Sequence, residues 1–204
     1  MALRDHPIDA IRHYVPDGTA EDIMEWLHQY KIHLKIRKER KSILGDYRPA
    51  HAGKPHTISV NASLNTYHFL ITFVHELAHL INHLNHGRKV MPHGKEWKSV
   101  FALLLSRFTK RGVFPSDILK ALEQSMGNLA ASTCSDVALF KVLRRYDEAK
   151  LTCLVEELIP GDRFRTEDGR LFSVHAKRRT RYECREIPSG RPYLFPSIYE
   201  VYKE

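Results

Sequence analysis

Apolar residues recur every three or four positions through most of the first 150 residues, which is the spacing of one helix face. The clearest run lies between Asn65 and His86 and stops at Gly87, a good left-handed residue for a helix C-terminus. Thr19 precedes another run, with Asp22 in the capping-box position. The pattern predicts helices over residues 8–14, 19–30, 65–86, 94–110, 116–127 and 135–146.

Strict alternation of apolar and polar residues, which is typical of a β-strand, occurs in two places. Ile32, Leu34 and Ile36 alternate with lysine and arginine, which predicts a half-exposed strand. Residues 45–61 hold two further strand candidates around a Gly/Pro turn, the second of which is 57–61.

The pattern of apolar and polar residues changes after Lys150. Short β-rich runs then alternate with turn signals such as Pro160-Gly161-Asp162, a pattern typical of a small antiparallel sheet or barrel. The sequence therefore predicts an α+β fold in two parts. Residues 1–150 form a domain with a small sheet and a helical C-terminal half, and residues 151–204 form a small β-rich module.

Composition narrows the class of protein. The three cysteines lie far apart and form no C-x-x-C pair, which excludes a disulfide scaffold or a cysteine zinc ribbon. The first ten residues carry charges where a signal peptide would be apolar. No apolar run approaches the roughly 20 residues needed to cross a bilayer. We therefore expect a cytoplasmic protein with no membrane partner, and no oligomeric state is predicted.

The net charge of +8 is uneven, since the first 150 residues carry +7 and the rest +1. The densest cluster is 31-KIHLKIRKERK-41, which we call the basic cluster. It predicts either weak, sequence-independent binding to a DNA phosphate backbone or a solvated strand face. It contains no aromatic residue that would stack on the bases of single-stranded DNA. Its cations are Lys31, Lys35, Arg37, Lys38, Arg40 and Lys41.

The segment 75-HELAH-79 matches H-E-x-x-H, in which a helix presents two histidines to a zinc ion at positions i and i+4. The pentapeptide alone is a weak signal, but its helix supports it. One side of that helix is apolar, whereas the other carries histidines and Glu76 with no lysine or arginine. A purely solvated face would carry lysine and arginine, so we expect His75 and His79 to bind a metal.

A third ligand must come from outside this turn of the helix. His83 lies on the same side, but at roughly 12 Å along the axis from His75 it is too far to share one ion. The chain turns after Gly87, which can return His93 to the metal, and Glu96 is the competing ligand. A metzincin would need glycine and histidine where this chain has Asn82 and Asn85, so that class is excluded. His93 is the predicted third ligand.

These residues predict one zinc ion held by His75, His79 and His93, with a water in the open fourth position. Glu76 is placed to act as general base on that water and to pass the proton to the departing amine. The roles of His83 and His86 stay open. Each could be solvated, support a metal ligand without binding the metal itself, or stabilise an oxyanion.

At this point the chain resembles the SprT-like family of zinc metallopeptidases, which is Spartan-related. The resemblance covers roughly residues 20–110. It rests on four ordered elements, 45-GDYRP-49, 57-TISVNASL-64, 75-HELAH-79 and 93-HGKEW-97.

The resemblance implies a zincin-type catalytic domain that cleaves proteins, in some members those attached to DNA. It also implies that the histidine of the H-G-x-x-W element is the third ligand, here His93. Many members carry a C-terminal cysteine zinc ribbon, but this chain has only Cys153 and Cys184 in that region. A second zinc is therefore not expected.

The C-terminal hairpin 177-KRRTRYECRE-186 is a second candidate for nucleic-acid contact. The alternative, which we favour, is a structural packing module with an ordinary basic turn. The function of this module is not otherwise predicted. The cations of the hairpin are Lys177, Arg178, Arg179 and Arg181.

The function predicted is zinc-dependent endopeptidase activity on protein or peptide substrates. The substrate is expected to pair by strand addition with residues 57–61, namely Thr57, Ile58, Ser59, Val60 and Asn61. The alternative is a nucleic-acid-binding or scaffold protein with a structural zinc site and little turnover, and a hydrolase of another substrate class uses the same groups. The physiological substrate is not predicted.

Overall fold

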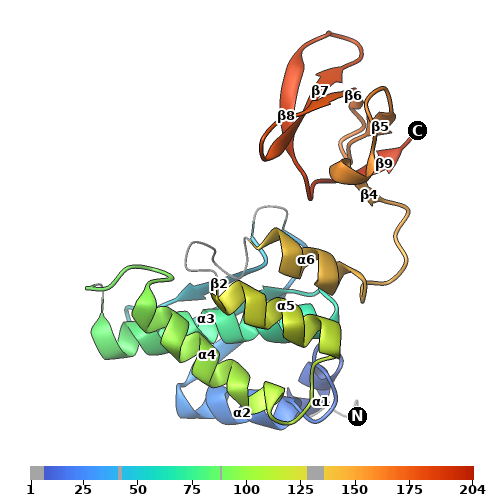
Figure 1. Ribbon diagram of the computed structural model, residues 1–204. Helices are drawn as coiled ribbons and strands as arrows, with labels where there is room; N and C mark the ends of the chain where they lie inside the picture. The colour runs from blue at the N-terminus through green and yellow to red at the C-terminus, as the bar shows by residue number, and fades with distance from the viewer. Residues whose placement is uncertain (1–6, 41–42, 88, 128–135) are drawn as a thin grey trace, which may run out of the picture. The chain divides into compact units, whose positions relative to one another are not determined.

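The computed structural model describes residues 7–40, 43–87, 89–127 and 136–204. The chain forms two compact units, Met1–Asp147 (unit 1) and Glu148–Glu204 (unit 2). The colour bar of Figure 1 locates each unit by its residue numbers. Within the described residues, unit 1 combines helices with a three-stranded sheet, and unit 2 is built around a six-stranded sheet. The predicted α+β class is confirmed.

Unit 1 begins with two helices and three strands and continues with four helices. Its elements are α1 (Pro7–Arg12), α2 (Ala20–Gln29), β1 (Ile32–Arg37), β2 (Gly45–Arg48), β3 (His56–Asn61), α3 (Thr66–His86), α4 (Lys95–Thr109), α5 (Ser116–Gly127) and α6 (Val137–Arg144). The predicted helices are all present, with ends shifted by a few residues. Residue 135, where the last was expected to begin, lies outside the described residues.

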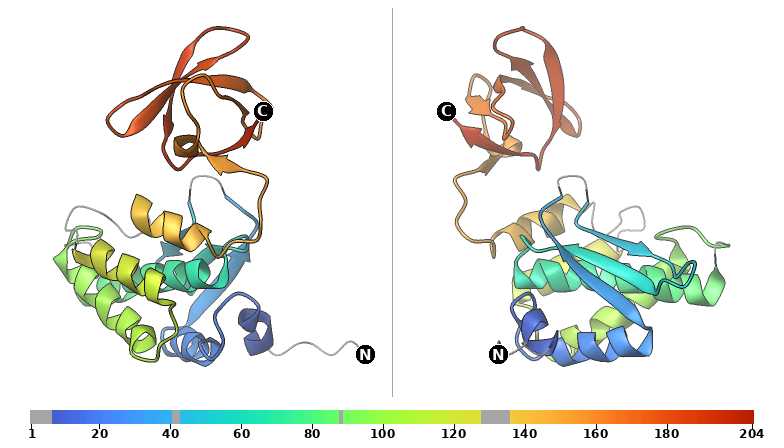
Figure 2. Two further views of the ribbon diagram at one scale, coloured as in Figure 1. Left: turned by 45° about the vertical axis from the view of Figure 1, so that its right-hand side comes forward. Right: turned by 180° about the vertical axis from the view of Figure 1, so that it is seen from behind.

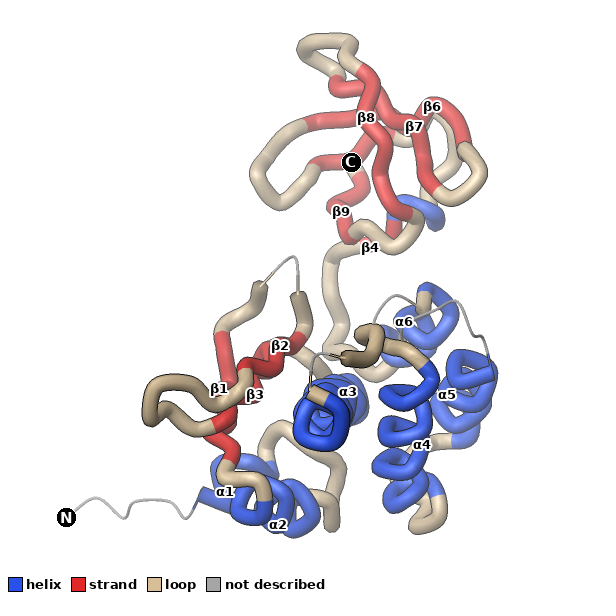
Figure 3. The backbone as a smooth tube through the Cα atoms, turned by 90° about the vertical axis from the view of Figure 1, so that its left-hand side faces the viewer, coloured by secondary structure: helices blue, strands red, loops and turns tan. Residues whose placement is uncertain are grey.

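Helix α3 is the centre of unit 1. Seen along its axis in Figure 3, it lies between the three strands and α4. Its start is fixed by Asn65, whose side chain accepts a hydrogen bond from the His68 amide, and its end by Gly87 at φ 63°. Because α3 is covered on two sides, the side predicted to be polar is also largely buried, and Thr72 is 1% exposed.

The sheet of unit 1 has the strand order β1-β3-β2. β1 runs parallel to β3, with Ile32 opposite His56, and β2 runs antiparallel to β3, with Gly45 opposite Val60. Ile58 and Val60 are fully buried and belong to the core beneath the sheet. Viewed from behind, the strands lie in front of α3 (Figure 2).

The predicted capping box of the second helix is wrong. Thr19 is the N-cap residue of α2, but its side chain makes no capping hydrogen bond. Its hydroxyl donates instead to the carbonyl of Pro16 at 2.7 Å. Asp22 is buried and forms ion pairs with Arg107 and Arg111 from the α4 region. The acidic side chain thus ties α2 to the end of α4 instead of capping its own helix.

Unit 2 is a small antiparallel sheet with the strand order β4-β9-β5-β6-β7-β8. Its own core contains stacked aromatic rings, with Phe164 and Phe172 5.5 Å apart. A short 3-10 turn at Val155–Glu157 follows β4. The strands are β4 (Cys153–Leu154), β5 (Arg163–Arg165), β6 (Leu171–Lys177), β7 (Arg181–Glu186), β8 (Pro192–Pro196) and β9 (Glu200–Lys203).

None of the helices in the described part of the chain is long and apolar enough to span a bilayer.

Candidate metal centre

Three predicted site residues lie on consecutive turns of α3, near its middle. His75 and Glu76 are 3% and 6% exposed, and His79 is half-buried. They share a side of the helix because positions i and i+4 are neighbours on a helix surface. The packing of α3 on both the sheet and α4 therefore holds these polar side chains inside the protein, where few rotamers are open to them.

His93 reaches the same place from the connection between α3 and α4. Its backbone is left-handed, with φ 59°, which is uncommon for a residue other than glycine. The following amide, of Gly94, donates to the carbonyl of Met91 at 3.0 Å and closes a tight turn. A side chain at position 94 would clash, since a Cβ there would lie 2.9 Å from that carbonyl oxygen. The turn thus returns the imidazole of His93 to α3.

The Nε2 atoms of the three histidines form a nearly equilateral triangle. The His75–His79 distance is 3.1 Å, and His93 is 3.0 Å from each of the other two. Zinc–nitrogen bonds of 2.0–2.1 Å at tetrahedral angles place two ligand nitrogens about 3.3–3.4 Å apart. The observed triangle fits such an ion closely.

Hydrogen bonding among these rings does not account for the triangle. A neutral imidazole Nε2 carries either one proton or one lone pair, so three such atoms cannot satisfy all three contacts. Three imidazole nitrogens converging on one point are a typical donor set for zinc. Within the described residues, His75, His79 and His93 are also the group found close enough together to hold a metal ion.

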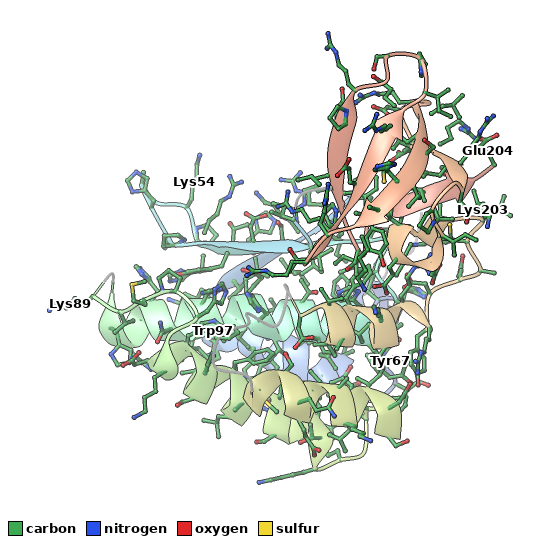
Figure 4. The ribbon with its side chains drawn as sticks, turned by 45° about the horizontal axis from the view of Figure 1, so that its top comes forward. Lys54, Tyr67, Lys89, Trp97, Lys203 and Glu204 are labelled. Carbon is green, nitrogen blue, oxygen red and sulfur yellow. The ribbon has the colours of Figure 1, made fainter. Side chains whose placement is uncertain are left out.

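Trp97, which is labelled in Figure 4, packs against all three histidines of the triangle. It is 1% exposed, and its ring centroid lies 4.6, 5.3 and 4.8 Å from those of His75, His79 and His93. Its indole Nε1 is buried and has no hydrogen-bond partner among the described residues. The ring also stacks on Phe101 with centroids 4.9 Å apart, and this packing limits how far the imidazoles can tilt.

Burial keeps the three imidazoles in the neutral form that binds metals. Desolvation, which is the largest cause, and the charges of neighbouring histidines together lower the pKa of His75 to about 2 and that of His79 to about 4. The pKa of His93 is also lowered, first by burial and then by the charge of Lys98. Protons therefore compete weakly for these nitrogens near neutral pH.

Glu76 is the only carboxylate on α3, where it directly follows His75 and precedes His79 by three residues. Burial, together with the smaller effect of the negative charge of Asp46, raises its pKa to about 8. A hydrogen bond from the backbone of Tyr47 and the charge of Arg40 act in the opposite direction. A cation bound by the histidines would likewise favour the carboxylate form.

The close approach of β2 to Glu76 depends on Gly45. A Cβ at position 45 would lie 2.8 Å from Cγ2 of Thr72 and 3.0 Å from Cγ of Glu76. Any larger residue would push β2 away from α3. Gly45 and Trp97 are positioning residues that the sequence pattern did not single out, although both lie in the quoted elements GDYRP and HGKEW.

The other candidate residues near the triangle do not join it. Glu96, the competing ligand, is exposed on the first turn of α4. His83 is half-buried, with its ring 6.1 Å from that of Tyr47, whose hydroxyl lies 3.0 Å from Nδ1 of His56. His86 is exposed near the end of α3. Their roles stay open.

The basic cluster is not one continuous stripe. Lys35 and Arg37 lie on β1, whereas Lys31 precedes it and Lys38 follows it, and of these four only Lys35 is partly buried. Arg40 turns inward and forms an ion pair with Asp46. Lys41 lies outside the described residues.

The basic hairpin of unit 2 is partly neutralised. Arg178 forms an ion pair with Glu183, and Lys177 lies over the ring of Tyr182 at 5.8 Å from its centroid. Arg179 and Arg181 are exposed. Two of the four cations are therefore engaged within the unit, which weakens the case for this hairpin as a nucleic-acid contact.

The predicted pairing of a substrate with residues 57–61 is wrong. These residues form most of β3, the central strand, which pairs with β1 along one edge and β2 along the other. The backbone of Thr57, Ile58, Ser59, Val60 and Asn61 thus has no free edge to offer. The alternating pattern predicted a strand but not its place in the sheet.

The fold and the triangle define the class as an α+β protein with a histidine-based candidate metal site. A model of the SprT-like family matches residues 17–112, so the resemblance to this family is confirmed over that segment. The segment runs from just before α2 to just after α4 and includes every residue of the triangle. Neither the curated proteins nor the solved structures that were searched gave a match.

Proposed function

We propose that this protein is a zinc-dependent endopeptidase, with zinc held by His75, His79 and His93 and with Glu76 as general base. The observation that carries the proposal is the triangle of Nε2 atoms 3.0–3.1 Å apart, with a buried carboxylate on the same helix. The match of residues 17–112 to the SprT-like family supports it.

When bound, zinc supplies Lewis-acid polarisation of a carbonyl and of water, without any redox chemistry. Glu76 supplies the proton transfers. Its carboxylate accepts a proton from the attacking water and delivers it to the nitrogen of the departing amine, which leaves as a neutral amine. The hydrogen bond from the Tyr47 backbone and the contact with Gly45 fix where that carboxylate lies.

An architectural site fits these residues less well. Structural zinc is almost always bound by four protein ligands, whereas the cluster found within the described residues has three. A purely structural site also has no use for a buried carboxylate beside it, because burial of an ionisable group is costly. Both features favour the catalytic role.

The substrate edge that we propose is β2 in place of β3. The carbonyl of Leu44 accepts a hydrogen bond from the Asn61 amide at 2.9 Å. In an antiparallel pair, every second residue makes its backbone hydrogen bonds to the partner strand, and the residues between point the other way. Gly45 and Tyr47 therefore direct their amides and carbonyls away from β3. The Tyr47 backbone contact with Glu76 agrees with this orientation. Within the described residues β2 pairs with β3 alone. An extended peptide added to this edge would lie beside Glu76.

Backbone N-methylation of a peptide substrate tests this edge. Alternate amides of an added strand face the sheet. Methylation of one of these amides removes a hydrogen bond to β2 and places a methyl group against the strand, so it should lower kcat/KM by about tenfold. Methylation at the intervening positions should have little effect. Equal tolerance at all positions would exclude strand pairing while leaving the metal centre untouched.

Metal dependence tests the proposed function itself. The zinc-loaded full chain should cleave an unfolded protein, cleavage should stop on chelation, and it should return on adding one equivalent of zinc. Peptide products measured by mass spectrometry are the readout. Cleavage that persists in protein shown to be free of metal, or no cleavage at full zinc occupancy, would refute the proposal.

A further inference from the structure

Asn61 is a buried polar residue at the end of β3 whose side chain bonds to the segment just before β2. It is 1% exposed. Its Oδ1 accepts a hydrogen bond from Nε of Arg40 at 2.8 Å, and its Nδ2 donates to the carbonyls of Arg40 at 3.2 Å and Ile43 at 3.0 Å. Its backbone amide donates to the carbonyl of Leu44 at 2.9 Å. Asn61 thus holds the chain at three positions immediately before β2 begins.

Arg40 connects Asn61 to β2. Its Nη1 donates to Oδ1 of Asp46 at 2.5 Å, and Asp46 also accepts from the hydroxyl of Ser59 and from Nε of Arg48. Burial acts to raise the pKa of Asp46, but these hydrogen bonds outweigh it and lower the pKa, so the carboxylate is ionised at neutral pH. The contacts therefore run from β3 through Arg40 to β2 and return to β3 at Ser59. We call Asn61, Arg40, Asp46 and Ser59 the Asn61 network.

The Asn61 network lies on the face of the sheet opposite to α3. Side chains alternate along a strand, and Val60 points into the core, so Ser59 and Asn61 point the other way. On β2, Gly45 approaches α3 and Asp46 points away from it. Three members of the network line a hollow of about 540 Å³ on this face. Substitutions in the network should therefore leave the histidine triangle on α3 in place.

Pairing with β3 alone gives β2 few hydrogen bonds. β2 has four residues, and in an antiparallel pair only every second residue bonds to the partner strand. On the α3 side, Gly45 fits closely against Thr72 and Glu76 but has no side chain that could hold the strand there. The Tyr47 backbone bonds to Glu76, so a displacement of β2 would move a contact of that carboxylate. The Asn61 network supplies bonds that the strand pairing lacks.

We propose that the members of the Asn61 network are positioning residues that hold β2, the proposed substrate edge, against Glu76. The polar atoms of the Asn61 side chain are all paired, so its removal leaves Nε of Arg40 and two carbonyls without their partner. β2 then loses bonds to β3 at the end that contacts Glu76. The effect on catalysis rests on the proposed function, whereas the effect on β2 does not.

The first test follows amide hydrogen exchange of the full chain by NMR in the presence of zinc and compares Asn61→Ala with Thr19→Ala. Thr19 is also buried and bonds to a backbone carbonyl, but it lies at the start of α2, so its loss weakens unit 1 without touching β2. The amides of Asp46 and Arg48, which face β3, should exchange at least roughly tenfold faster in Asn61→Ala, the effect of about one lost buried hydrogen bond. Relative to the α3 amides, their exchange should be unchanged in Thr19→Ala.

The second test assays the same variants on the two N-methylated peptides that probe the substrate edge. Asn61→Ala should lower kcat/KM by roughly 10–100-fold at unchanged zinc content, the cost of misplacing groups at a reacting centre by about 1 Å. The penalty for methylating an amide that faces β2 should shrink, because β2 is no longer held in register with the substrate. Thr19→Ala should keep the wild-type discrimination, since loss of stability alone changes the amount of active protein and not its preference between two peptides.

Two outcomes would overturn the proposal. If the exchange of Asp46 and Arg48 rises no more than that of the α3 amides, the network does not hold β2. If it rises while cleavage and peptide discrimination keep their wild-type values, β2 needs no such positioning. A wild type that cleaves nothing would instead refute the proposed function, and hydrogen exchange would then decide by itself whether the network holds β2.

Arg40→Lys is the second variant, for use if Asn61→Ala does not fold. Arg40 is only half-buried, and lysine keeps its charge. A single ammonium lacks the planar fork with which Arg40 bonds to Asn61 and Asp46 at once. The same changes in exchange and in peptide discrimination are expected on a smaller scale, and the same two outcomes count against the proposal.

Discussion

Glu76→Gln should lower peptide hydrolysis by roughly 10²–10⁴-fold, the range typical of a lost general acid–base group. The amide has nearly the shape of the carboxyl, so it keeps the contact with Gly45 that positions α3 against β2. It has no carboxylate to accept a proton from water. Zinc content should stay at one per chain, because Glu76 is not part of the histidine triangle. The measurement is kcat/KM on a peptide of defined cleavage site, with zinc determined in the same sample.

The matched control is Glu96→Gln, which makes the same chemical change at an exposed position on the first turn of α4. It should leave the rate within a few-fold of the wild type. If Glu76→Gln retains the wild-type rate in a preparation free of contaminating protease, Glu76 is not the base. If both variants lose activity together, the effect is not specific to the site.

The helix that carries the site could be predicted from local pattern, because a helix has a fixed rise and a fixed angle per residue. Those two numbers place His75 and His79 together and exclude His83. They do not show that the histidine side of α3 is buried. That burial comes from α4, which packs on α3 and brings Trp97 against the imidazoles. The sequence thus predicted the ligands of α3 but not the lowering of their pKa values.

The strand that offers a free edge could not be predicted, because sheet order is set by contacts between distant segments. Alternation marks both 32–36 and 57–61 as strands, yet it does not say which of them is central. The structure places β3 between β1 and β2, and the pairing of β1 with β3 spans more than twenty residues of sequence. For the same reason the sequence could not show that Lys35, Arg48 and Lys54 line one hollow, since only the fold brings them together.

Losing a residue that only hydrogen-bonds to a metal ligand typically reduces metal affinity by roughly 10–100-fold. Removing the imidazole of His93, a proposed ligand, should reduce zinc affinity by more than this. His93→Asn is the sharper variant, because asparagine tolerates the left-handed backbone found here, with φ 59°, better than alanine does. The loop should therefore keep its course while the third nitrogen is lost. Affinity is measured by competition with a chromophoric chelator, together with the stoichiometry at saturation.

Glu96→Ala is the discriminating control for the third ligand, since Glu96 and His93 compete for that role in the sequence. In the structure His93 lies 3.0 Å from both other nitrogens, whereas Glu96 is exposed, so Glu96→Ala should bind one zinc with wild-type affinity. The reverse result, with zinc kept by His93→Asn and lost by Glu96→Ala, would make a glutamate the third ligand. Such a site would carry a negative charge among its ligands and leave the ion a weaker Lewis acid, because three neutral imidazoles donate no charge to it.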